Sequence, residues 1–253
     1  MSLFSSIKKA FKNENGVGTS ADKLHVDLHS HLLPGIDDGA KTMEESVAMI
    51  KRLTKHGVEK IITTPHIMYE FYRNTPEIIQ GKLQETREAL AAEGVDVQLE
   101  AAAEYYLDDQ FISMLKHKEP LLTFGSNMVL METNYIQDHP KLMDIFFELK
   151  VLGYTPVFAH PERYMYLQLT KDNYQKYQDI FFAGVLFQVN LMSFTGYYGN
   201  QIKQVADYLL KERMIHLVGS DIHKMEHVSV VHGLKRSKLF DKIMELPLMN
   251  NQL

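Results

Sequence analysis

The strongest constraint on the fold of this chain is a regular alternation of short β-rich runs with amphipathic segments. Thr42 followed by Glu45 forms a capping box before one predicted helix, and Pro76 occupies the first turn of the next. Such alternation is typical of a parallel sheet, and a length of 253 residues favours closure into a barrel. The predicted strands cover residues 23–31, 59–66, 96–105, 127–133, 155–162, 186–190 and 214–223. The predicted helices cover residues 42–57, 75–94, 108–117, 140–153, 171–183 and 200–212.

Seven strands are one fewer than this architecture usually has. We therefore predict an α/β fold, a distorted (β/α)7 TIM-like barrel, with residues 24–253 forming a single domain. Residues 1–23 form an N-terminal extension in which apolar residues recur at helical spacing between lysines. Either this extension is a helix that binds a membrane surface or a partner, or it packs on the domain or is disordered; we prefer the second interpretation. The tail, residues 235–253, carries no chemical motif.

Composition excludes several classes of protein. The chain has no cysteine, which rules out disulfides, thiolate metal sites and cysteine nucleophiles. Its formal net charge is −5, so a strongly basic nucleic-acid binder is disfavoured. No apolar run approaches the roughly 20 residues of a membrane span, and the N-terminus lacks the apolar core of a signal peptide. We predict a cytoplasmic protein without nucleic-acid partners.

Residues with metal-binding side chains gather at the ends of the predicted strands. Six of the seven strands deliver one, and in a β/α barrel the carboxyl ends of the strands form the mouth of the active site. Any one of these residues has an ordinary explanation, but their shared location favours a metal site. The candidates are His29, His31, His66, Glu104, Glu132, His160, Asp221 and His223, with Asp37 and Asp38 in the loop after the first strand.

The local patterns differ in how strongly they indicate a metal. His29 and His31 are two residues apart, which in a strand puts both imidazoles on one face. Glu104 follows three alanines, where a buried carboxylate is costly without a partner or cation. His66 alone would be more typical of a capped core histidine. Imidazole and carboxylate without thiolate suit Mn, Fe or Zn, and this many ligands exceed one coordination sphere. Two or three metal ions are therefore expected. Two metal ions about 3.5–4 Å apart are a common arrangement for phosphoryl hydrolysis.

The set of motifs DLHSHLLPGIDDG, TPH, HPERY and GSDIH, with Glu104 and Glu132 at strand ends, resembles the PHP superfamily of metal-dependent phosphoesterases. QVN-x2-SF-x-G at 188–196 resembles one branch, the bacterial tyrosine-protein phosphatases of capsule and exopolysaccharide operons, of the CpsB/YwqE type. The resemblance spans residues 24–230. It implies the PHP fold and a site of three divalent ions, with manganese preferred and iron, cobalt or zinc as alternatives. The extension 1–23 departs from the family pattern.

The resemblance also implies roles for individual residues. Glu104 would bridge two ions, Asp37 would orient its loop and Arg163 would bind the phosphoryl oxygens. The alternative for Arg163 is a surface ion pair with Glu162. Three tyrosines could stack on a phosphotyrosine ring or simply pack, namely Tyr164, Tyr197 and Tyr198. The implied ligands are His29, His31, Glu104 and Asp221 for the first ion, Glu104, Glu132 and His160 for the second, and Asp38, His66 and His223 for the third.

Several functions compete for such a site. The leading hypothesis is a metal-dependent protein-tyrosine phosphatase that acts on a membrane tyrosine autokinase controlling polysaccharide synthesis. Alternatives on the same fold are a small-molecule phosphatase, such as a histidinol-phosphate phosphatase, an exonuclease, disfavoured by the acidic balance, and a degenerate module kept for interaction. An intact ligand set argues against the last. The sequence leaves open the physiological metal, the kinase, the general acid and the oligomeric state.

Overall fold

The structure is a computed structural model that describes residues 24–168 and 173–253. The predicted N-terminal extension, residues 1–23, lies outside the described residues. Nine strands form one parallel sheet in the order β3-β5-β6-β7-β8-β9-β1-β2-β4. They are β1 (Val26–Ser30), β2 (Lys60–Thr63), β3 (His66–Ile67), β4 (Gln98–Ala101), β5 (Glu104–Tyr106), β6 (Met128–Glu132), β7 (Thr155–Ala159), β8 (Leu186–Asn190) and β9 (Leu217–Ile222).

The nine strands correspond to the seven predicted ones, because two of those are interrupted. The run predicted over 59–66 contains β2 and begins β3, and the run over 96–105 contains β4 and begins β5. Across the interruptions the ladder continues, since Ala102 donates to the carbonyl of Thr63 and Glu104 to that of Pro65. β3 and β4 stand at the two ends of the strand order, and the chain bridges these ends twice, between β2 and β3 and between β4 and β5. The prediction of a distorted seven-stranded β/α barrel is confirmed.

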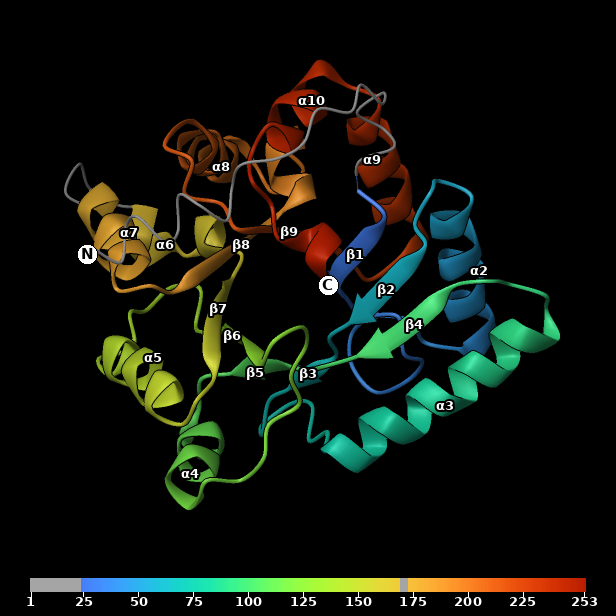
Figure 1. Ribbon diagram of the computed structural model, residues 1–253, viewed down its shortest axis with the longest axis horizontal. Helices are drawn as coiled ribbons and strands as arrows, with labels where there is room; N and C mark the ends of the chain where they lie inside the picture. Colours follow the sequence, from blue (N-terminus) through green and yellow to red (C-terminus); the bar gives the residue numbers. More distant parts are fainter. Residues whose placement is uncertain (1–23, 169–172) are drawn as a thin grey trace.

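Helices cover the outside of the sheet (Figure 1). Thr42 and Thr75 cap two of them as expected, and Pro76 is the first residue of α3. The tail, residues 235–253, in which we found no chemical motif, contains a further helix, α10. The helices are α2 (Met43–Thr54), α3 (Pro76–Ala92), α4 (Asp109–His117), α5 (Leu142–Val151), α6 (Met165–Gln168), α7 (Asn173–Phe182), α8 (Asn200–Lys211), α9 (Met225–Lys235) and α10 (Lys238–Met244), with 3-10 turns η2 (Pro161–Arg163), η3 (Leu191–Thr195) and η4 (Asn250–Gln252).

Two apolar cores stabilise this arrangement. The larger core packs the helices against the outer face of the sheet. The smaller core fills the inside of the ring with strand residues such as Leu28, Leu130 and Leu217, and the tail residues Met249 and Leu253 pack against it. Figure 1 accordingly places the C-terminus beside β1 and β2. Within the described part of the chain, no helix has both the length and the apolarity needed to cross a membrane.

Candidate metal centre and active site

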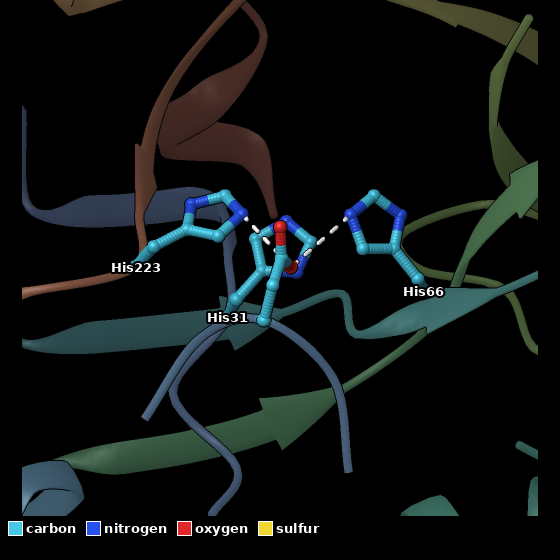
Figure 2. Close-up of side chains that lie close together, drawn as sticks. His31, His66 and His223 are labelled. Atoms are coloured by element: carbon cyan, nitrogen blue, oxygen red, sulfur yellow. Dashed lines mark ion pairs between the residues drawn. The ribbon is translucent and has the colours of Figure 1, made fainter. Parts of the chain in front are cut away.

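All nine predicted metal ligands converge at the carboxyl ends of the strands. Figure 2 shows three of them, His31, His66 and His223, with their rings directed toward one another from three different segments. Among the residues that the structure describes, four groups of side chains each place their ligand atoms within 4.8 Å of one another. These groups are His31, Asp38, His66 and His223; His29, His31 and Glu104; His29, His160 and Asp221; and His66, Glu104 and Glu132.

Unusual backbone conformations aim several of these side chains. His29, His160 and Asp221 have φ values of 70°, 31° and 52°, in the left-handed region that non-glycine residues seldom adopt. The pairing of β1 with β9 also shifts register between Leu28 and Ser30, around His29. Such strain persists where the surrounding structure holds it, and it is common at functional sites. Here it turns imidazoles and a carboxylate at strand ends toward one shared space.

Glu104 lies at the centre of the cluster and is fully buried. Its Oε2 atom is 3.1 Å from His29 Nε2, 3.4 Å from His31 Nε2 and 3.3 Å from His66 Nδ1. Its Oε1 atom is 3.0 Å from His160 Nε2. The two oxygens of one carboxylate therefore face different sets of imidazoles, which is the geometry that a bridging ligand requires.

The three ligand sets that the resemblance implies are not separate in space. The resemblance groups His66 with Asp38 and His223. Asp38 Oδ1 lies 3.5 Å from His66 Nε2 and 3.3 Å from His223 Nε2. His66 Nδ1 also lies 3.0 Å from Glu132 Oε1, so the same imidazole approaches the second set. His31 likewise belongs to two groups. The ligands form one continuous cluster with shared members.

A second layer of polar groups orients the ligands, and the sequence reasoning missed most of it. His29 Nδ1 is 2.6 Å from Gln188 Oε1, and Asn190 Nδ2 donates to Asp221 Oδ2 at 2.6 Å. Gln188 and Asn190 are two residues apart on buried β8, the predicted strand without a ligand. A polar pair with period two on an otherwise apolar buried strand was the available signal. Partners of this kind fix the orientation of metal-binding imidazoles.

Asp37 anchors the loop that carries Asp38. Its Oδ2 atom is 2.8 Å from His31 Nδ1 and accepts a hydrogen bond from the backbone N–H of His66 at 3.2 Å. Its Oδ1 atom accepts from the N–H of Gly39 at 2.9 Å. Asp37 thus ties together the loop and two strands that carry ligands.

Several buried atoms of the cluster lack hydrogen-bond partners. They include His29 Nε2, His31 Nε2, His66 Nδ1 and Glu104 Oε2, although each lies near an atom of opposite polarity. Unpaired buried polar atoms are costly, so they indicate a missing partner. A set of imidazole and carboxylate donors aimed at a common space fits divalent cations such as Mn, Fe or Zn. The residues present therefore suit a metal centre.

The electrostatics of the cluster lead to the same conclusion. Burial alone would lower the pKa of His66, but the carboxylates of Glu132 and Glu104 raise it to about 9. Burial alone would raise the pKa of Glu104, but His29 and His66 outweigh burial and hold that pKa well below its usual range. The buried carboxylates thus strongly attract positive charge. Protons and divalent cations compete for the same atoms.

Arg163 does not pair with Glu162, so that alternative is wrong. Arg163 Nη1 donates to Asp221 Oδ2 at 2.9 Å, while buried Glu162 accepts from Ser193 Oγ at 2.6 Å. The guanidinium carbon lies 4.7 Å from the ring centre of Tyr135 and 4.5 Å from that of Tyr198. Arg163 is therefore held between two aromatic rings at the edge of the ligand cluster.

A cavity of about 620 Å³ opens above the cluster. Asp38, Arg163 and Tyr198 line it, and so does His227, which the sequence reasoning left off the rim. His227 Nδ1 accepts the backbone N–H of His223 at 3.1 Å. Tyr164 does not line it: the side chain is fully buried and its hydroxyl accepts from the N–H of Thr133 at 3.2 Å. Of the three tyrosines considered for stacking, Tyr198 alone lines this cavity.

Fold and site define a parallel β/α-barrel protein whose mouth carries a cluster of cation-binding side chains. The family model for capsular polysaccharide synthesis proteins, CpsB/CapC, matches residues 25–230, and the chain belongs to this family. The tyrosine-protein phosphatase CpsB of Streptococcus pneumoniae is 30% identical over 210 residues, which cover 79% of this chain and 84% of CpsB. The tyrosine-protein phosphatase YwqE of Bacillus subtilis is 28% identical over 203 residues, 79% of this chain and 78% of YwqE.

The fold is also that of a solved structure. A crystal structure from the study of YwqE of Bacillus subtilis and CpsB of Streptococcus pneumoniae, described there as metal-dependent tyrosine phosphatases, superposes with a TM-score of 0.76. It is 24% identical and covers 87% of this chain and 90% of the other. The resemblance to this family is confirmed.

Proposed function

We propose that this protein is a metal-dependent protein-tyrosine phosphatase of capsule or exopolysaccharide synthesis. The observation that carries the proposal is the convergence of nine imidazole and carboxylate ligands with one anchored guanidinium in a single cavity. Membership of the CpsB/CapC family supports it, as do relatives named tyrosine-protein phosphatases.

The metal ligands are assigned as part of this proposal. Two or three divalent ions would be held by the cluster, with manganese preferred and iron, cobalt or zinc as alternatives. Glu104 would bridge, since its two oxygens face different imidazoles. When bound, such ions lower the pKa of an attacking water and offset negative charge on the phosphoryl group. The full set is His29, His31, Asp38, His66, Glu104, Glu132, His160, Asp221 and His223.

The chain's own residues supply the remaining parts of the reaction. Arg163 would bind the phosphoryl oxygens, because its planar fork matches phosphate and its position is fixed by Tyr135, Tyr198 and Asp221. Charge on those oxygens changes during the reaction, so a pre-positioned cation can lower the barrier. Tyr198 lines the cavity beside Arg163 and would contact the phenol ring of the substrate.

The proposed substrate is a phosphotyrosine on a membrane tyrosine autokinase that controls polysaccharide synthesis. Its phosphorylated tyrosines would be met in the cytoplasm, where we place this protein. The cavity of about 620 Å³ admits a phosphotyrosine side chain from a neighbouring polypeptide.

The test compares two substrates on the purified full chain loaded with Mn²⁺. Phosphate release from a phosphotyrosyl peptide should far exceed release from histidinol phosphate, and dialysis against a chelator should abolish both. Added Mn²⁺ should restore activity. Hydrolysis of histidinol phosphate without hydrolysis of the peptide would establish the small-molecule alternative instead.

A further inference from the structure

A second groove lies beside the mouth, and nothing in the proposed reaction uses it. Its volume is about 440 Å³, and it runs between residues 67–74, the first turn of α3 and the N-terminal half of α4. Ile67, Phe111 and Met114 contribute apolar surface to it. We call it the flanking groove.

The flanking groove and the metal cavity share one aromatic residue, Tyr72, in their walls. His66 and Ile67 are consecutive residues of β3 and lie on opposite sides of it; His66 lines the cavity and Ile67 lines the groove. The ring of Tyr72 stacks on His66 with 5.5 Å between ring centres, and Tyr72 lines both spaces. A ligand group in the cavity and another in the groove would therefore lie on either side of Tyr72.

The wall of the groove is exposed but firmly held. Tyr69 is 52% exposed, and its backbone N–H donates to Asp108 Oδ2 at 3.0 Å. Arg73 donates to the carbonyl of Tyr69 at 2.8 Å and lies 4.6 Å from the centre of its ring. Next to it, Phe71 is 68% exposed at the edge of the metal cavity. Exposed aromatic surface beside a cavity, on an ordered hairpin, is typical of a binding site.

We propose that the flanking groove binds an apolar side chain adjacent to the phosphotyrosine of a protein substrate. The inference rests on the proposed function. A phosphotyrosine held in the cavity would bring its polypeptide chain to the mouth, so neighbouring side chains would pass Tyr72 and reach the groove. A small phosphate ester would fit in the cavity and leave the groove empty.

The charges of the groove favour the same occupant over an acidic one. Glu77, Asp108 and Glu119 line it, with Arg73 as the one positively charged lining residue. Arg73 is already engaged with Tyr69, and Asp108 accepts the N–H groups of Tyr69 and Phe111. The carboxylates therefore repel an aspartate next to the phosphotyrosine, whereas Ile67, Phe111 and Met114 offer apolar surface to a leucine there.

The experiment measures kcat and KM for three kinds of substrate on the Mn²⁺-loaded full chain. These are a phosphotyrosyl peptide with leucine at each neighbouring position in turn, the same peptides with aspartate there, and p-nitrophenyl phosphate. The variants are Tyr69→Ala, which removes the wall, and Tyr69→Phe, which keeps it. Phe147→Ala is the matched control, because Phe147 is an exposed aromatic residue on α5 outside both spaces.

At one of the positions, wild-type protein should prefer leucine over aspartate. Tyr69→Ala should raise KM for that leucine peptide about tenfold, as expected for the loss of one buried apolar contact, with kcat and p-nitrophenyl phosphate turnover unchanged. Tyr69→Phe and Phe147→Ala should match wild type. Unchanged peptide kinetics in Tyr69→Ala, or equal losses on all three substrates, would overturn this inference while the proposed function stands. Failure of wild type to hydrolyse any peptide would instead refute the proposed function.

Discussion

At the amino end of the barrel strands, the ring is filled by the C-terminal tail; at the carboxyl end, it is filled by imidazoles and carboxylates. Both ends bury polar groups, and those that the tail brings to the first end are hydrogen-bonded. Buried Asn250 accepts from the backbone N–H of Val218 at 2.9 Å and donates to its carbonyl at 2.8 Å. Lys60 Nζ donates to the carbonyl of Leu253 at 2.6 Å.

The mouth contrasts with this end in both pairing and backbone strain. Unpaired buried atoms of His29, His31, His66 and Glu104 cluster there, and three of its ligands have positive φ. Pairing such atoms normally raises the free energy of unfolding, and the polar groups of the tail are paired in this way. A mouth left unpaired in the protein alone therefore indicates a ligand that completes it. The predictions that follow test this division between a structural end and a functional end.

The largest effect is expected from Glu104, and a second carboxylate on the same interrupted strand serves as its control. Glu104→Ala should lose bound metal and more than about 10³-fold of the turnover on a phosphotyrosyl peptide, because it removes a ligand shared by several imidazoles. Glu100→Ala is the matched control; Glu100 pairs with Lys60 at 2.9 Å near the opposite end. Glu100→Ala should keep metal and rate. Elemental analysis beside steady-state kinetics measures both, and full metal content in Glu104→Ala would break the comparison.

The next largest effect concerns Arg163. Arg163→Ala should keep its metal but lose about 10²–10³ in rate, the typical cost of removing one donor aimed at the reacting group. Arg163→Lys should recover part of the loss, since an ammonium cannot make two parallel hydrogen bonds.

The control for Arg163 is an arginine that serves the fold. Arg87 donates twice to the carbonyl of Leu99, at 2.8 and 2.6 Å. Arg87→Ala should lower the free energy of unfolding by about 1–3 kcal/mol with little effect on kcat. Wild-type turnover in Arg163→Ala with metal retained would remove Arg163 from the mechanism.

A smaller effect is expected from Asp37, which contacts the candidate ligand His31. Asp37→Asn should weaken metal binding by about 10–100-fold, because the amide is a poorer partner for the Nδ1–H of His31 than the carboxylate. Titration of the metal-free protein with Mn²⁺, followed by activity, measures the affinity. Asp144→Asn on the exposed side of α5 should bind Mn²⁺ as wild type does. Equal affinities for Asp37→Asn and wild type would show that Asp37 only holds the loop.

The sequence predicted the candidate ligands better than the geometry that aims them. The shared strand-end position of many such residues selected His66, Glu104 and Glu132 together, because the carboxyl ends of parallel strands meet at one mouth. The left-handed backbone conformation of His29 and His160 could not be predicted from the sequence, since only tertiary packing makes that conformation favourable. The same holds for Arg163, whose partner is distant in sequence.

Long-range pairing also explains what the fold prediction missed. Residues 246–253 carry no periodic pattern, yet they close one end of the barrel by contacts with strands that lie far away in the chain. Periodicity reports which face of an element is buried, and it does not report which distant segment covers that face.

The smallest effect is expected at the tail end of the barrel, where His216 lies. Its Nδ1 atom accepts the backbone N–H of Phe187 at 3.0 Å, which requires the neutral imidazole, and its ring stacks on Phe181. Burial lowers the pKa of His216 to about 4. In the unfolded chain the pKa returns to its usual value of about 6.5, so between these values the unfolded state binds the proton first. This contribution to stability is present above about pH 6.5 and is lost as the pH falls toward 4.

Urea unfolding of the full chain at pH 7.5 and at pH 5 measures this contribution. Wild type should lose more free energy of unfolding on acidification than His216→Gln, which cannot titrate there. Because His216 is only partly buried, the expected difference is about 1–2 kcal/mol. Both proteins should be assayed with Mn²⁺ present, and their activities at pH 7.5 should agree, since His216 does not line the metal cavity. A loss of activity in His216→Gln at unchanged stability would mean that the two ends of the barrel are coupled and would break the division between them.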